Sequence, residues 1–241
     1  MIPANVPPGF RLFYTTADFD GRVDDRIREF VRPAKLFSCH QVHGIRVEDR
    51  QSCLSGQAGL PVLHEPECDA LWSDEKDSAL AIKVADCLPI SIIDPKKSII
   101  ANIHSGWRGA VQRITEITLD AVPCEARESF AFLGPSIRVC CFEVGEEVAA
   151  QFDPRYLDRT LGSKPHVDIP AMTIDILRQR GFQEIVDTEL CTRCNGGVAE
   201  LSGYQVAENH RQLGDSATGQ PLFHSYRREK RSGRNLAIVA G

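Results

Sequence analysis

Residues 90–111 read ISIIDPKKSIIANIHSGWRGAV, which is two apolar runs separated by a turn and followed by a glycine-rich segment. Asp94 and Pro95 are typical turn residues, so the two runs are expected to pair as a hairpin. Side chains alternate between the two faces of a strand, which places Asn102 and His104 on the same face near the end of the second run. Part of the sheet is therefore expected to be antiparallel.

The rest of the chain fits an α/β core. A helix is expected over residues 106–121, capped by Ser105, and another over residues 170–180, with a proline in its first turn and Gly181 after its end. Ten short apolar runs are expected to be strands: 12–16, 35–42, 45–48, 69–72, 80–84, 90–93, 99–104, 130–133, 184–186 and 236–240. A length of 241 residues, of which 42% are hydrophobic, favours a single domain over residues 1–241.

Charge and apolar patterning exclude several classes of partner. The formal net charge of −5, without a basic stripe, argues against binding to nucleic acid or to an anionic membrane. No apolar run has the length of a membrane span, and the first residues lack the charged and apolar regions of a secretory signal. Reduced thiols in the cytoplasm are the expected state of the nine cysteines, and the oligomeric state is left open.

Four of these cysteines lie in two short motifs. Cys191 and Cys194 in CTRC resemble half of a zinc knuckle or a redox pair, but the sequence has no second CxxC to complete a knuckle. A disulfide between the neighbours Cys140 and Cys141 would be strained, and consecutive residues in a strand face opposite ways. The sequence alone therefore assigns no site to these four cysteines.

A histidine or cysteine stands at the end of each of three apolar strands. His43 lies in CHQVHG, Cys87 in VADCLP and His104 in IIANIHSG. Two imidazoles and a thiolate suit a divalent metal, and three protein ligands leave one coordination position open for substrate or water. Ordinary strand-end histidines and a buried apolar cysteine are the alternative, which three such positions together disfavour. Along KLFSCHQVH, Gln41 shares the face of His43, whereas His40 points the opposite way and is not expected to be a ligand.

The segment after His104, SGWRGA, suits an anion or sugar site beside the metal. Gly106 and Gly109 allow backbone amides close to a ligand, and a helix N-terminus favours anions. Arg108 offers a planar fork for phosphate or carboxylate. The alternative is a tight turn with Trp107 in the core, which fits Trp107 well and Arg108 poorly.

Six motifs occur in the order seen in the laccase-domain family: QVHG, ADCLP, HSGWRG, GPSIRVCCFEVGEEV, CTRC, and SYRR followed by SGR. The chain resembles this family from about Gln41 to its C-terminus. The family was first labelled multicopper polyphenol oxidoreductase and is now described as purine nucleoside phosphorylase with adenosine deaminase activity. The resemblance implies a single-domain, four-layer α/β/β/α sandwich with mixed sheets, and a zinc site of His43, Cys87 and His104.

The resemblance also implies a substrate class and a set of site residues. Adenosine, inosine, guanosine and methylthioadenosine would undergo phosphorolysis, which needs phosphate held beside the ribose. Adenosine deamination would be a second activity. Catalytic roles fall to Cys87, His104 and Arg108, and contacts to nucleoside and phosphate fall to Gln41, Arg108, Ser225 and Arg227.

The chain departs from the family pattern between CTRC and SYRR, where residues 195–221 form a long insertion rich in glycine and polar residues. Such an insertion costs little, because the entropy of loop closure grows slowly with length. We expect a flap that borders the active site and excludes water during the reaction. The alternative is a surface ornament far from the site.

Two other functions stay open as alternatives. A copper-dependent polyphenol oxidase needs clustered imidazoles, commonly in HxH pairs, and the seven histidines form no such pair. Copper could still bind at the three-ligand site in place of zinc. A cysteine hydrolase would use Cys87 as nucleophile and His43 or His104 as base, although a metal on the thiolate would quench it. Metal content separates the hydrolase from the metal enzymes.

Overall fold

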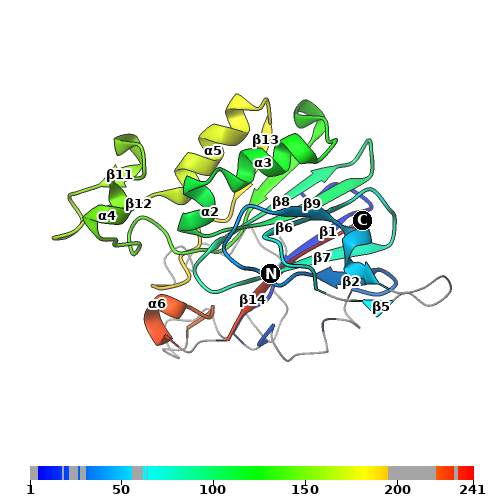
Figure 1. The fold of residues 1–241 in the computed structure, drawn as a ribbon, viewed down its shortest axis with the longest axis horizontal. Coiled ribbons are helices and arrows are strands. Elements are labelled where there is room, and N and C mark those ends of the chain that lie inside the picture. Colours follow the sequence, from blue (N-terminus) through cyan, green and yellow to red (C-terminus); the bar gives the residue numbers. More distant parts are fainter. Residues whose placement is uncertain are drawn as a thin grey trace.

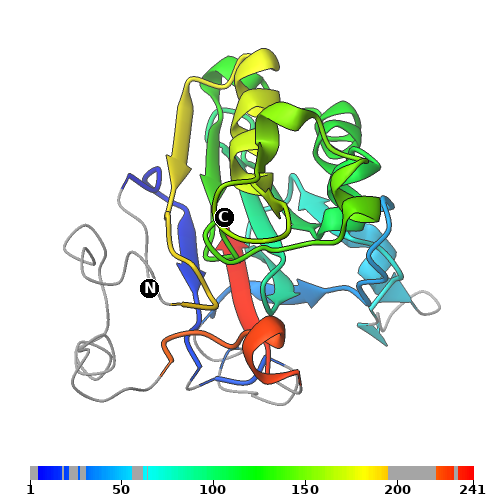
Figure 2. The same ribbon diagram turned by 90° about the vertical axis from the view of Figure 1, so that its left-hand side faces the viewer.

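Two mixed β-sheets lie face to face, and helices cover the outer face of the larger sheet (Figure 1). Figure 2 shows the same layers from the side, with α5 packed against the larger sheet. The expected class, an α/β sandwich with mixed sheets, is confirmed. The computed structural model describes residues 5–17, 19–21, 27, 31–55, 62–63, 65–194, 221–230 and 233–241.

The smaller sheet has four strands in the order β1-β14-β7-β2. Strand β14 pairs antiparallel with β1 and β7, whereas β2 runs parallel to β7. The bounds are β1 (Arg11–Tyr14), β14 (Asn235–Ala240), β7 (Ser78–Val84) and β2 (Lys35–Ser38). This sheet therefore joins the two ends of the described chain.

The larger sheet has six strands in the order β13-β10-β8-β9-β6-β3. Its two outer pairs are parallel and its inner pairs antiparallel, and β8 and β9 form the hairpin expected from the turn at Asp94 and Pro95. The bounds are β13 (Glu184–Asp187), β10 (Phe130–Leu133), β8 (Leu88–Asp94), β9 (Ile99–Ser105), β6 (Ala70–Ser73) and β3 (Val47–Asp49).

Five helices lie in the described part of the chain, and α2, α3 and α5 pack on the larger sheet (Figure 1). Among the described helices, none has the length and apolar character needed to span a bilayer. The bounds are α2 (Trp107–Val111), α3 (Ile114–Ala121), α4 (Glu146–Ala149), α5 (Ile169–Gln179) and α6 (Tyr226–Glu229). Short pieces complete the description: η1 (Arg50–Cys53), η2 (Ala126–Glu128), η3 (Pro154–Tyr156), β4 (Leu54–Ser55), β5 (Val62–Leu63), β11 (Leu157–Asp158) and β12 (His166–Val167).

Strand β9 is buried on both faces because it lies between the helices and the smaller sheet. Ile103 faces the helix layer, whereas Ile100 faces the smaller sheet. Asn102 shares the face of Ile100, and its amide nitrogen donates to the carbonyls of Leu80 at 3.0 Å and Ala237 at 2.8 Å in the smaller sheet. A buried amide is stable only when it is hydrogen-bonded, so these contacts fix how the two sheets dock.

The helix expected over residues 106–121 is in fact two helices. Ser105 ends β9, and Gly106 takes the N-cap position of α2. Arg113 has a left-handed backbone with φ 69°, which a continuous right-handed helix does not accommodate. The helix axis is therefore interrupted between α2 and α3, and the expectation of one long helix capped by Ser105 is corrected.

Two expectations fall partly outside the described residues. On the outer face of the smaller sheet, Phe13 and Ile238 pack with Ile27 and Val31, where the fourth layer of the sandwich was expected. Most of residues 22–30 lie outside the described part of the chain. Residues 195–220 of the insertion also lie outside it, so the flap stays a prediction.

Candidate metal centre and active site

The three residues predicted as metal ligands meet in the structure. The ligating atoms of His43, Cys87 and His104 all lie within 4.8 Å of one another. Cys87 precedes β8, and the hairpin register pairs Leu88 with Ser105, so Cys87 and His104 come from neighbouring positions. The imidazole rings of His43 and His104 meet edge to face, with centroids 4.9 Å apart. This group is called the triad below.

His43 reaches the triad from a turn and not from a strand. Strand β2 ends at Ser38, and the backbone of His40 pairs with Pro66 and Cys68 outside the smaller sheet. His43 itself has a left-handed backbone with φ 60°. The strand expected over residues 35–42 is therefore too long, and the argument that placed His43 by strand alternation is corrected even though His43 does join the triad. His40 is not part of the triad, as expected.

Asp69 holds the turn and the third ligand in place, and sequence analysis missed it. Its carboxylate accepts backbone N–H groups from Val42 at 3.2 Å, His43 at 3.0 Å and Gly44 at 2.7 Å. One carboxylate oxygen also lies 2.7 Å from Nδ1 of His104, and the side chain is fully buried. A carboxylate on Nδ1 fixes the tautomer of a histidine and leaves Nε2 for a metal. A lone acid before an apolar strand carries no sequence signal for this role.

The triad favours a thiolate on Cys87. Burial opposes ionisation, but the attraction of His104 and hydrogen bonds from His104 and His43 lower the pKa of the Cys87 thiol to about 6. Burial likewise opposes the charged form of His104, yet Cys87 and Asp69 raise its pKa to about 9. The thiolate is the form of cysteine that binds metals, so the donor set of two imidazoles and one thiolate fits zinc.

Gly106 is required beside the triad by close packing. A Cβ atom on Gly106 would lie 3.0 Å from Sγ of Cys87 and 3.3 Å from the His43 ring. A side chain there would push two ligands apart. The glycine expected to bring backbone amides near a ligand therefore also lets α2 start directly against the metal site.

The triad opens into a cavity of about 590 Å³. Four of the side chains that line this cavity are cationic: Lys83, Arg108, Arg227 and Arg234. Apolar side chains line the cavity as well, namely Ala85, Leu88, Ile137, Phe142 and Ile169. A ligand with an anionic group and a flat apolar ring system would match this lining.

Arg108 and Gln41 both line the cavity. The guanidinium of Arg108 lies 4.4 Å from the centroid of the Trp107 ring, so stacking orients it while its side chain stays exposed. Trp107 is partly buried against the helix-side core, as expected. Gln41 exchanges two hydrogen bonds of 2.8 Å with the backbone of Lys83, which fixes its amide at the edge of β7. Gln41 thus shapes the wall, and its contact with substrate stays a prediction.

The C-terminal motif reaches the same cavity through Arg227. Its backbone N–H donates to Asp86 at 2.6 Å, and its guanidinium donates to the carbonyl of Glu143 at 2.7 Å. Ser225 is fully buried and accepts from the N–H of Arg228 at the start of α6, so its hydroxyl supports the helix and does not line the cavity. Arg227 therefore lines the cavity, as predicted, whereas Ser225 caps the helix that carries Arg227. Contact of either residue with substrate stays a prediction.

Comparisons with known proteins place the chain in a family. Residues 14–240 match the family described as multi-copper polyphenol oxidoreductase laccase. A purine nucleoside phosphorylase of Pseudomonas aeruginosa is 30% identical over 199 residues, covering 80% of this chain and 75% of that protein. A protein named adenosine deaminase, from an unknown prokaryotic organism, is 27% identical over 185 residues, covering 69% of this chain. The match covers 66% of that protein, so the chain spans just under two thirds of its length.

A solved structure agrees with the fold. A protein from Neisseria meningitidis superposes with a TM-score of 0.76 at 23% identity, covering 100% of this chain and 99% of that one. At this identity the likeness supports the architecture and no more. The sequence match carries the family assignment: the chain belongs to the multi-copper polyphenol oxidoreductase laccase family, whose relatives include proteins named purine nucleoside phosphorylase and adenosine deaminase.

Proposed function

We propose that this chain catalyses phosphorolysis of purine nucleosides at a zinc ion held by His43, Cys87 and His104. One observation carries the proposal: a set of three metal ligands opens into a cavity that also holds four cationic side chains. Zinc bound there would supply Lewis acidity at its open coordination position. The names of the relatives support the same substrate class.

The reaction makes separate demands on the cavity. Phosphorolysis forms a bond between a phosphate oxygen and C1′ of the ribose and breaks the bond from C1′ to the purine nitrogen. The bonding electrons and a proton end on the purine. Arg108 and Arg227 suit the phosphate, because a planar guanidinium binds its oxygens in pairs and offsets their charge. Phe142 and Ile169 suit the purine, because apolar walls exclude water from its ring.

Asp69 and Gly106 prepare the site in this proposal. Asp69 orients His104 and holds the turn of His43, so both imidazoles stand ready before a metal or substrate arrives. Gly106 lets α2 approach Cys87. The partners are free nucleosides and phosphate, and a cytoplasmic setting belongs to the same proposal, supported by nine cysteines of which none forms a disulfide.

The test is product analysis by mass spectrometry. The zinc-loaded protein is incubated with inosine, adenosine, guanosine and methylthioadenosine, each with and without phosphate. We expect free base and a sugar 1-phosphate that form only when phosphate is present. Conversion of adenosine to inosine without phosphate would reveal the deaminase activity named in a relative. Failure with every nucleoside would contradict the proposal.

Two controls separate the alternatives. Copper-loaded protein is assayed for oxidation of phenols, and turnover by copper protein alone would favour the polyphenol oxidase. Protein stripped of metal by a chelator is assayed on nucleosides, because a hydrolase that uses Cys87 as nucleophile would keep or gain activity. We expect the stripped protein to be inactive and zinc to restore it.

A further inference from the structure

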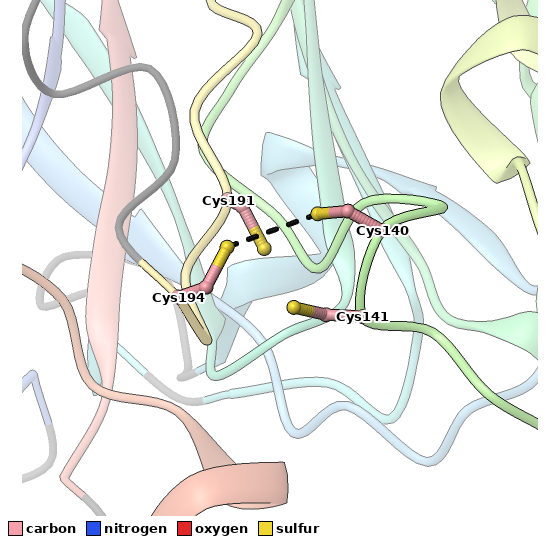
Figure 3. A group of neighbouring side chains, drawn as sticks. All are labelled: Cys140, Cys141, Cys191 and Cys194. Carbon is pink, nitrogen blue, oxygen red and sulfur yellow. Dashed lines mark hydrogen bonds between the residues drawn. The ribbon is translucent and has the colours of Figure 1, made fainter. Parts of the chain in front are cut away.

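A second group of metal-ligating side chains lies in the turns that follow β10 and β13. It consists of Cys140, Cys141, Cys191 and Cys194, whose sulfur atoms all lie within 4.8 Å of one another. Figure 3 shows the four sulfurs directed toward the space between the two turns. None of the four is among the residues that line the cavity. We call this group the cysteine cluster.

The expectation that Cys140 and Cys141 face opposite ways is wrong. It assumed a strand, but the two residues lie in a turn, so both sulfurs reach the same space. Cys141 and Cys191 are buried, with exposed fractions of 6% and 1%, while Cys140 and Cys194 are exposed. The pair in one turn therefore supplies the second half of the site that CTRC lacks in sequence.

The spacing of two of the sulfurs fits tetrahedral coordination of one metal ion. Sγ of Cys140 lies 3.8 Å from Sγ of Cys194. Zinc–thiolate bonds of about 2.3 Å at tetrahedral angles put neighbouring sulfurs about 3.8 Å apart. A disulfide would hold the two sulfurs at about 2.05 Å. The distance matches four thiolates around one ion better than a covalent pair.

We propose that Cys140, Cys141, Cys191 and Cys194 bind a second zinc ion as a closed four-thiolate site. Four protein ligands fill a tetrahedral coordination sphere, so this ion is structural. It joins the turn after β10 to the turn after β13. The proposal concerns a different ion from that of the triad and does not depend on nucleoside chemistry.

Hydrogen bonds connect the cysteine cluster to the wall of the cavity. Thr192, between its two CTRC cysteines, donates its hydroxyl to Asp86 at 2.7 Å. Asp86 in turn accepts from the backbone of Arg227 at 2.6 Å and precedes Cys87. Arg228 donates to the carbonyl of Thr192 at 2.8 Å. The second zinc therefore fixes the segment that supports one wall of the cavity from behind.

The experiment removes the triad first, so that one site is measured alone. Cys87→Ala protein is purified without added chelator, and its zinc is counted by elemental analysis. We expect about one zinc per chain to remain. X-ray absorption should place four sulfurs at about 2.3 Å from that zinc. A zinc-free variant, or a zinc with nitrogen ligands, would overturn the proposal.

Two further variants locate the remaining zinc. Adding Cys191→Ser to Cys87→Ala should remove it, whereas adding Cys124→Ser, a half-buried cysteine outside both groups, should leave it. A measurement on the unaltered chain does not depend on how the variants fold. When this chain is denatured in chelator without reductant and treated with an alkylating reagent, all nine cysteines should be alkylated. Alkylation at seven, with a disulfide between Cys140 and Cys194, would overturn the zinc site in favour of a redox pair.

Discussion

The triad and the cysteine cluster differ in how many ligands they offer and in what surrounds them. The triad has three ligands and opens into a cavity with cationic walls. The cysteine cluster has four ligands in two turns and lies apart from the cavity lining. Ligand count separates reactive metal sites from structural ones. One chain of this family therefore carries the donor sets for both kinds of site, and each set can be broken by a single substitution.

The largest contrast is expected between Cys87→Ala and Cys194→Ser. Loss of Cys87 breaks the open site, so we expect nucleoside turnover below about 1% of the original, with a fall in melting temperature smaller than that of Cys194→Ser. Loss of Cys194 opens the closed site, so we expect a fall in melting temperature of about 5 °C or more. Turnover and calorimetry on the same preparations measure both.

His40→Ala is the matched control for the triad, because His40 lines the same cavity without being a ligand. It should keep its zinc and most of its turnover. Equal loss of activity in Cys87→Ala and Cys194→Ser, with equal loss of stability, would erase the distinction between the two sites.

Asp69→Asn tests whether the triad depends on its buried carboxylate. The amide has one acceptor oxygen where the carboxylate has two, and its NH₂ group would face donors on the backbone and on His104. We expect zinc affinity at the triad to fall about 10- to 100-fold. Competition with a metal-sensitive dye measures this on Cys191→Ser protein, which isolates the triad. Unchanged affinity would remove Asp69 from the metal site.

Arg108→Lys tests the cavity wall with the metal left in place. Lysine keeps the charge and loses the planar fork and the stacking on Trp107. We expect turnover to fall about 10- to 100-fold, as for loss of a charged hydrogen bond, at unchanged zinc content. A raised KM for phosphate should accompany it. Turnover near the original value would take Arg108 out of the site.

The smallest effect is expected from the insertion. Replacing residues 195–221 by a short linker should leave zinc at both sites and change the KM for nucleosides a few-fold, about 2- to 5-fold for the loss of a covering loop. Steady-state kinetics on all four nucleosides measures this. Identical constants for every substrate would show that the insertion does not border the active site.

The sequence was most informative where local pattern and tertiary position coincide. The hairpin followed from two apolar runs and one turn, and its register brings Cys87 beside His104. Asp69 was missed because its role depends on a turn that is distant in sequence. The cysteine cluster was missed because strand alternation was applied to Cys140 and Cys141, which lie in a turn. Contacts between distant turns leave no periodic trace in a sequence.

The location of Cys87 has a mechanical consequence. It lies where the chain passes from β7 in one sheet to β8 in the other, while His104 is the second-last residue of β9 in the larger sheet and His43 follows β2 in the smaller one. A metal bound by all three would clamp the two layers at one corner, and its binding free energy would oppose their separation. Amide hydrogens along the facing sheets should then exchange more slowly once metal is added, which makes solvent exchange at the sheet interface a gauge of metal occupancy.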